Sequence, residues 1–244
     1  MIKINNLTKK YKDKLAVDNL NLEIKTGELF SLLGTNGAGK TTTIKMLSTL
    51  ILPTSGEVEI NNLDLVKDSS KIKEIINISP QETAVASNLT VLENLYFMAG
   101  IYQIPNKEDK IKELIKLFKL EEVLKQKAKT LSGGYQRKLS IAISLINNPK
   151  ILFLDEPTLG LDVISRHDLW KVIEALKGKT TIMLTTHYME EAEVLSDRIG
   201  IMNKGKLIEL GTSKELIKKA KTKNFEDAFI KIIEEDNNEN TNIC

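Results

Sequence analysis

The sequence predicts an α/β fold with a mostly parallel sheet core, an N-terminal antiparallel β-subdomain and an all-helical insertion. From Ser132 onward, near-continuous apolar strands alternate with amphipathic helices, which is typical of a parallel sheet covered on both faces. Residues 1–60 instead hold short strands with short links, which favours antiparallel pairing. Residues 85–130 show only helical patterns, so we expect a helical subdomain there.

The composition is that of an ordinary soluble globular protein, with 41% apolar and 28% charged residues among 244. At ~150 residues per unit, this length suggests a large domain or a domain with a subdomain. Lys and Arg number 35 against 33 Asp and Glu, and the net charge of +2 gives no reason to expect a nucleic-acid partner. The start lacks the apolar core of a signal peptide, and no stretch approaches the ~18 apolar residues of a membrane span. The single cysteine, Cys244, cannot form an internal disulfide, and we expect a cytoplasmic chain.

The early strands are predicted at residues 2–6, 20–24, 28–33 and 57–60. Leu20, Leu22 and Ile24 alternate with polar neighbours, as in a half-buried strand. Tyr11 is expected in the polar loop between the first two strands.

The helical insertion follows a strand predicted at residues 75–79. Thr90 can cap a helix that extends to about Ile104, and a second helix is expected over residues 108–120. In that second helix the apolar residues recur at the spacing of one buried face.

The remaining elements alternate between helix and strand. Strands are predicted at residues 151–154, 181–184, 198–202 and 206–210, and helices from Tyr135, over 163–176, from Tyr188 and twice near the C-terminus. Residues 236–240 are rich in Asn and acidic side chains and are expected to be disordered.

A glycine-rich loop between a strand and a helix is the first candidate site. It has the pattern G-x-x-x-x-G-K-[ST] and comprises Gly34, Thr35, Asn36, Gly37, Ala38, Gly39, Lys40, Thr41 and Thr42. The glycines let main-chain N–H groups surround a phosphate, and the helix N-terminus adds unpaired donors. Lys40 would reach the β- and γ-phosphates, and the Thr41 hydroxyl would hold Mg²⁺. The alternative is a glycine turn that caps a helix without a ligand, but such a turn needs neither the lysine nor the hydroxyl.

Two acidic residues follow the strand at 151–154, at the same edge of the predicted sheet. Asp155 would bind Mg²⁺ directly or through water, and Glu156 would polarise the attacking water. Pro157 is expected to hold Glu156 in an extended conformation. A pair of solvated acids at a strand end is the alternative, which the nearby Lys40 and Thr41 make less attractive.

The histidines and one glutamine complete the candidates at this edge. His187 follows the strand that begins at 181 and could contact a γ-phosphate, whereas His167 lies inside a helix and is expected at the surface. Gln81 follows another strand and could complete the Mg²⁺ shell or orient water, although a turn glutamine without a role is a serious alternative.

A second potential anion site precedes the strand at 151–154. Ser132 is a good helix cap, and Gly133 and Gly134 allow close main-chain approach. One nucleotide does not need two such sites. We therefore expect the second to serve a nucleotide bound to another copy of the chain.

Taken in chain order, these motifs resemble the nucleotide-binding domain of ABC transporters. The resemblance extends from Ile2 to about Leu216 and rests mainly on Leu131-Ser132-Gly133-Gly134 placed just before the Asp-Glu strand. It implies a phosphate-loop NTPase (RecA-like) domain over residues 1–220, with a helical subdomain at about 85–130. Residues 221–244 would form a C-terminal helix and a disordered tail.

The resemblance also implies a head-to-tail dimer with two ATP molecules and Mg²⁺ between the copies. Lys40 of one copy and Ser132 to Gly134 of the other would hold each ATP. Tyr11 would stack on adenine, and Asp162 would lie in a loop that crosses the dimer seam. Glu156 would act as the catalytic base, with Lys40 and His187 at the phosphates and Thr41, Gln81 and Asp155 at the metal.

The partners implied are a second copy or a paralogous ATPase subunit, and a membrane permease subunit gripped by residues of about 81–130. The chain would then sit on the inner face of the cell membrane. The stretches 155–162 and 186–193 look most like the branch that energises export of drugs, antibiotics, sodium or polysaccharide. Tyr135 and Leu159 depart from the commonest residues of the family, and we expect altered packing at Tyr135 without lost activity.

Two other functions are consistent with parts of the sequence. A soluble ATPase of the same superfamily that acts on DNA or ribosomes usually carries two motif sets or long coiled-coil arms, and neither is found here. A small-molecule kinase would leave the second glycine-rich site without a purpose.

Overall fold

The computed structural model describes residues 1–241; Cys244 and the last part of the expected C-terminal tail lie outside the described residues. The strands are β1 (Ile2–Tyr11), β2 (Lys14–Ile24), β3 (Leu29–Gly34), β4 (Ser55–Ile60), β5 (Leu63–Asp64), β6 (Ile76–Ser79), β7 (Ile151–Asp155), β8 (Thr181–Thr186), β9 (Arg198–Asn203) and β10 (Lys206–Gly211). The α-helices are α1 (Lys40–Leu47), α2 (Ser69–Ile75), α3 (Val91–Ile101), α4 (Lys107–Phe118), α5 (Gly133–Ser144), α6 (Val163–Leu176), α7 (Met189–Leu195), α8 (Ser213–Ala220) and α9 (Phe225–Thr241). Two 3₁₀ turns, η1 (Glu121–Val123) and η2 (Ala128–Thr130), lie between α4 and α5.

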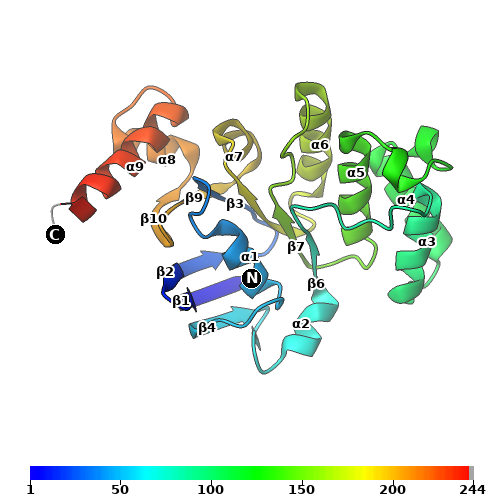
Figure 1. Ribbon diagram of the computed structural model, residues 1–244, viewed down its shortest axis with the longest axis horizontal. Coiled ribbons are helices and arrows are strands. Elements are labelled where there is room, and N and C mark those ends of the chain that lie inside the picture. The colour runs from blue at the N-terminus through cyan, green and yellow to red at the C-terminus, as the bar shows by residue number, and fades with distance from the viewer. Residues whose placement is uncertain (242–244) are drawn as a thin grey trace.

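The strands form two sheets, as the sequence predicts. The larger has six strands in the order β10-β9-β3-β8-β7-β6, in which β9, β3, β8, β7 and β6 run parallel and β10 is antiparallel to β9. The smaller is antiparallel, in the order β2-β1-β4-β5. Figure 1 shows α3, α4 and α5 at one end of the molecule and α8 and α9 at the other.

Both faces of the larger sheet are covered, which explains the near-continuous apolar strands. In β7, Leu152 and Leu154 belong to one hydrophobic cluster, whereas Ile151 and Phe153 belong to another. This division follows from the alternation of side chains along a strand. The second cluster also contains the apolar residues of α1, so α1 is fixed between the two sheets.

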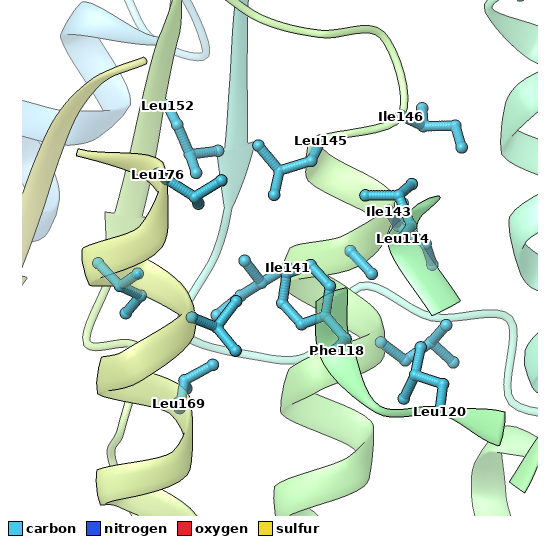
Figure 2. Packing of buried hydrophobic residues seen from close by; sticks show 14 of the residues in the cluster. Leu114, Phe118, Leu120, Ile141, Ile143, Leu145, Ile146, Leu152, Leu169 and Leu176 are labelled. Carbon is cyan, nitrogen blue, oxygen red and sulfur yellow. The ribbon is translucent and has the colours of Figure 1, made fainter. Parts of the chain in front are cut away.

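The helical insertion is joined to the sheet core through the first cluster. Thr90 and Glu93 form a capping box at the start of α3, as the Thr90 cap predicts. Leu114 and Phe118 of α4 are fully buried and belong to the same hydrophobic cluster as Ile141 of α5 and Leu169 of α6 (Figure 2). The buried face of α4 has the helical spacing read from the sequence.

Two local expectations are wrong, and two short elements were not predicted. Tyr11 is the last residue of β1, paired with Lys14 across a tight hairpin, because the strand continues through polar residues on its exposed side. The elements β5 and α2 were not expected, since two and seven residues are too short to show a periodic pattern. Residues 236–240 are helical, because α9 packs Ala228 and Ile232 against the third cluster and Asn203 donates a hydrogen bond to Asp236 at 2.8 Å.

Within residues 1–241, no helix is both long enough and apolar enough to cross a membrane.

Candidate functional site

A cavity of about 440 Å³ opens beyond the carboxyl ends of β3, β7 and β8. This edge of a parallel sheet is where ligands bind in α/β proteins. The cavity is lined by Lys14, Ala16, Asn36, Gly37, Ala38, Gly39, Lys40, Thr41, Thr42, Gln81, Glu156, Leu159 and His187. The structure therefore brings most of the glycine-rich loop together with Gln81, Glu156 and His187.

The glycine-rich loop turns directly into α1. Gly37 and Gly39 have φ values of 81° and 105°, which L-residues with a side chain rarely adopt. A Cβ atom on Gly39 would lie 2.4 Å from the carbonyl oxygen of Ala16, so only glycine fits there. The loop thus passes close to β2 and presents the N-terminus of α1 to the cavity.

Lys40 is the first residue of α1 and is 5% exposed. Its Nζ donates to the carbonyl oxygens of Gly34 at 2.7 Å and Thr35 at 3.2 Å. The same Nζ lies 3.3 Å from Oε1 of Glu156. The lysine is therefore held at the cavity wall by loop carbonyls and by one acidic side chain.

Glu156 forms the centre of a triad with Lys40 and His187. Its Oε2 lies 2.7 Å from Nδ1 of His187, so each carboxylate oxygen has its own partner. Glu156 is buried, and its environment fixes the carboxylate towards the cavity. This is the geometry that a general base requires, with one neighbour to orient it and access to a bound water.

The main chain of Glu156 is left-handed, with φ of 49°, and the expectation of an extended conformation is wrong. Pro157 disfavours the right-handed helical region for Glu156. The N–H of Glu156 donates to the carbonyl and hydroxyl oxygens of Thr185, each at 3.1 Å, and these bonds hold the left-handed conformation. Such a conformation costs about 1–3 kcal/mol in a residue with a side chain and is concentrated at functional sites.

Asp155 and Thr41 place oxygen atoms side by side. Oδ1 of Asp155 accepts hydrogen bonds from the hydroxyls of Thr41 at 3.0 Å and Thr185 at 2.6 Å. A carboxylate, a hydroxyl and the nearby amide of Gln81 are the oxygen donors that a hard divalent cation prefers. The donor set therefore fits Mg²⁺.

Other predicted residues do not line this cavity. Tyr11 is 45% exposed at the end of β1, with Nζ of Lys9 5.1 Å from its ring centre. Ser132 caps α5 by accepting from the N–H of Tyr135 at 3.4 Å, and a Cβ atom on Gly133 would meet nothing within 4 Å. Asp162 caps α6, where hydrogen bonds from the side chain and main chain of Ser165 lower its pKa. These four residues are exposed to solvent and face outside the single chain.

His167 is exposed on α6, as expected. Its ring packs edge-on against Trp170, with 4.8 Å between the two ring centres.

Sequence reasoning missed several residues that support the site. Lys14 and Ala16 line the cavity from β2, and no motif marks them. Leu159, which the sequence marks only as a departure from the family pattern, lines it from the loop after β7. Thr185 could have been found, because it precedes His187 at the carboxyl end of a predicted strand and carries a hydroxyl. Arg137 was also missed, although it is one of only three arginines in the chain.

Glu191 is a further buried residue behind the site. Its Oε1 accepts from the hydroxyl of Thr158 at 2.8 Å and from Nε1 of Trp170 at 3.0 Å. Burial raises the pKa of the Glu191 carboxyl, and hydrogen bonds from Thr186, Thr158 and Trp170 oppose that rise only in part. From its sequence, an acidic run on a short helix is indistinguishable from a solvated face.

Comparison with known proteins decides the family. The sequence pattern of the ABC transporter family matches residues 17–159. This chain belongs to the ABC transporter family. The glycine-rich loop, Gln81, Glu156 and His187, which line the cavity, are among the motifs that carry the resemblance.

Three ABC transporter relatives illustrate the similarity. The chain is 39% identical over 219 residues to the linearmycin resistance ATP-binding protein LnrL of Bacillus subtilis, covering 88% of this chain and 70% of LnrL. It is 39% identical over 252 residues to the probable multidrug ABC transporter ATP-binding protein YbhF of Escherichia coli, covering 99% of this chain and 43% of YbhF. It is 43% identical over 218 residues to the human phospholipid-transporting ATPase ABCA3, covering 87% of this chain and 13% of that protein. The chain thus spans less than half the length of YbhF and ABCA3.

Solved ABC transporter structures share the fold. An ATP-binding cassette solved as a dimer in a post-hydrolysis state with ADP and Pi is 32% identical, with a TM-score of 0.78 over 87% of this chain and 98% of that chain. The protein cbiO1 of Clostridium perfringens, described as part of the ABC transporter complex cbiONQ, is 28% identical, with a TM-score of 0.80 over 89% and 90% of the two chains. These structures confirm the fold class predicted from the sequence.

Proposed function

We propose that this chain is the ATP-binding and ATP-hydrolysing subunit of an ABC exporter. The observation that carries the proposal is the triad of Lys40, Glu156 and His187 at the mouth of the glycine-rich loop. Phosphoryl transfer needs positioned charge more than covalent chemistry, and this triad supplies a cation, a base and an orienting ring in one cavity.

Each residue has a distinct task in ATP hydrolysis. The N–H groups of the loop and Nζ of Lys40 bind the phosphates, and Glu156 accepts a proton from the attacking water. His187 orients the Glu156 carboxylate through its 2.7 Å contact. Thr41, Asp155 and Gln81 would hold Mg²⁺, which neutralises charge on the phosphates when bound.

A second protomer completes the site in this proposal. Ser132, Gly133 and Gly134 are exposed or partly exposed at the start of a helix, and none of them lines the cavity of their own chain. A head-to-tail dimer, of two copies or of this chain with a paralogue, would bring them to the partner's ATP. Tyr11 would stack on adenine, and Asp162 would lie at the seam. The dimeric relative bound to ADP and Pi supports this assembly.

The membrane partner would bind to residues of about 81–130 on the cytoplasmic face. This subdomain exposes large apolar or aromatic side chains on α3 and at its C-terminal end, namely Tyr96, Phe97, Ile101 and Tyr102. Exposed apolar groups that cluster on one element mark interaction surfaces. The names of LnrL and YbhF support the export of drugs or antibiotics.

Steady-state ATP hydrolysis by the purified chain tests the proposal. Turnover should require Mg²⁺ and should vanish in the Lys40→Ala variant. The exchange Lys45→Ala is a matched control, because Lys45 is exposed on the same helix. A chain that binds no ATP, or that hydrolyses it equally well without Lys40, would refute the proposed activity.

A further inference from the structure

Arg137 makes an unusual set of contacts behind the cavity. It lies on α5, one turn beyond Gly133, and is 3% exposed. Its Nε donates to the carbonyl oxygen of Pro157 at 2.7 Å, and its Nη2 donates to that of Asp155 at 2.8 Å. Its Nη1 donates to the carbonyl oxygen of Pro80 at 2.5 Å and lies 3.4 Å from that of Gln81.

These acceptors belong to two loops that are far apart in the sequence. Pro80 and Gln81 follow β6, whereas Asp155 is the last residue of β7 and Pro157 comes directly after Glu156. One planar guanidinium thus joins the start of α5 to the loop of the candidate metal ligand and to the loop of the candidate base. A lysine could not do the same, since a single ammonium lacks the fixed fork of donors.

The position is demanding for a charged group. No ion pair within 4 Å involves Arg137 in the part of the chain that the structure describes, and its compensation comes from carbonyl oxygens. Burial lowers its pKa to about 10, while the carboxylates of Asp155, Glu191 and Glu156 oppose that change. The side chain stays protonated at neutral pH. A buried charge without a direct partner is costly, and an apolar residue would suffice if packing were the only need.

We propose that Arg137 is a positioning residue that couples the start of α5 to the Gln81 and Glu156 loops. The inference rests on the proposed function, in which Ser132 to Gly134 contact ATP held by the partner. Ser132 is the N-cap of the helix that carries Arg137. Closure against the partner's nucleotide would therefore move the guanidinium and align Glu156 and Gln81 of the same protomer.

Steady-state kinetics of Arg137→Lys provide the first test. The variant keeps the charge but cannot hold three carbonyl oxygens in one plane. We expect kcat to fall at least about tenfold with KM changed less than about threefold, because the phosphate contacts of Lys40 are untouched. The control is Lys138→Arg, the reverse exchange at the next residue, whose side chain pairs with Asp168 at 3.6 Å. The inference would be overturned if Arg137→Lys lowered kcat no more than Lys138→Arg does.

A double-mutant cycle separates positioning from general support of the fold. If Arg137 acts through Glu156, adding Arg137→Lys to Glu156→Gln should lower the residual rate by clearly less than the same substitution lowers the wild-type rate, because only the Gln81 loop is then left for Arg137 to position. If Arg137→Lys lowered the rate by the same factor in the Glu156→Gln variant as in the wild type, Arg137 would act independently of the base, which contradicts the proposal.

A measurement on the wild-type chain covers the case in which Arg137→Lys does not fold. With only three arginines, ¹⁵N-arginine labelling gives three Nε–H signals, which Arg166→Lys and Arg198→Lys assign. The Arg137 signal should exchange slowly with solvent and shift when a non-hydrolysable ATP analogue and Mg²⁺ are added. Rapid exchange or an unmoved signal would overturn the coupling. Absence of ATP hydrolysis by the wild type would instead refute the proposed function while leaving the exchange of this signal measurable.

Discussion

Two glycine-rich helix N-termini in this chain have main-chain donors that could bind phosphate, and they differ in how far the rest of the chain covers them. The first, at Lys40, is enclosed: its lysine is 5% exposed and already paired with Glu156. The second, at Gly133, is open: a methyl group added there would meet nothing within 4 Å. Both glycine-rich stretches look alike as sequence, but only the first lines the cavity together with Gln81, Glu156 and His187.

The difference shows what a single chain can and cannot supply. The enclosed site brings together a cation, a base, an orienting histidine and a pair of oxygen ligands in one cavity. The open site has an exposed helix start, and none of its residues lines the cavity that holds Lys40 and Glu156. We therefore regard the two as halves of one composite site formed by two protomers, and the following predictions probe that division.

The largest effect is expected from Glu156→Gln, which removes the base from the enclosed site. Hydrolysis should fall about 10²–10⁴-fold, the usual contribution of a general base, while ATP binding persists. Turnover and binding of a fluorescent ATP analogue measure the two quantities. Glu190→Gln, an exposed acid 3.8 Å from Arg166, should leave both unchanged. Near-normal hydrolysis in Glu156→Gln would remove Glu156 from its assigned role.

A smaller but more diagnostic effect is expected from Gly133→Ala at the open site. The single chain has room for the methyl group, so the free energy of unfolding should not decrease, yet the partner's nucleotide would collide with it. We expect hydrolysis to fall at least about tenfold. Gly100→Ala in α3 is the matched control, because that position is also helical and open, and its activity should be unchanged. An active Gly133→Ala variant would mean that nothing approaches this helix.

A change in the affinity for ATP alone is expected from a substitution of Tyr11, the exposed last residue of β1. Stacking of a base on an aromatic ring contributes about 1–3 kcal/mol, and Tyr11 is partly exposed, so Tyr11→Ala should raise KM by about fivefold with kcat preserved. The matched control is Tyr96→Ala, an exposed tyrosine that also has a lysine over its ring. An unaltered KM in Tyr11→Ala would exclude stacking at this position.

The smallest effect on catalysis is expected from Glu191→Gln, which instead changes how stability depends on pH. The folded-state pKa of Glu191 is raised above the ordinary value of 4.5, so its contribution is fully present below that pH and is lost as pH rises through the folded pKa. Across that window wild-type stability should fall relative to the variant by about 1.4 kcal/mol per pH unit. Urea unfolding from pH 4 to 8 measures the slope, with the exposed Glu193→Gln as control. If the free energy of unfolding changed with pH in the same way in the wild type and in Glu191→Gln, folding would not raise the pKa of Glu191, and the prediction would fail.

The sequence was sufficient for the features that depend on local pattern. The glycine-rich loop, the acids after β7, the histidine after β8 and the α6 boundaries all follow from residue type and spacing. It was insufficient for features that depend on contacts between residues far apart in the chain. The left-handed main chain of Glu156 depends on Thr185, which is 29 residues away, and the role of Arg137 depends on loops that only the fold brings together. The C-terminal helix likewise forms on a cluster that its polar composition does not reveal.

The composite site is tested most directly by mixing two variants that are inactive alone. Lys40→Ala disables the enclosed half, and Ser132→Arg blocks the open half. In a head-to-tail dimer of one copy of each, one of the two sites combines an intact Lys40 with an intact Ser132. Random pairing makes about half of the dimers mixed, so the mixture should recover about a quarter of the wild-type rate. A mixture no more active than the average of the two separate variants would contradict the account.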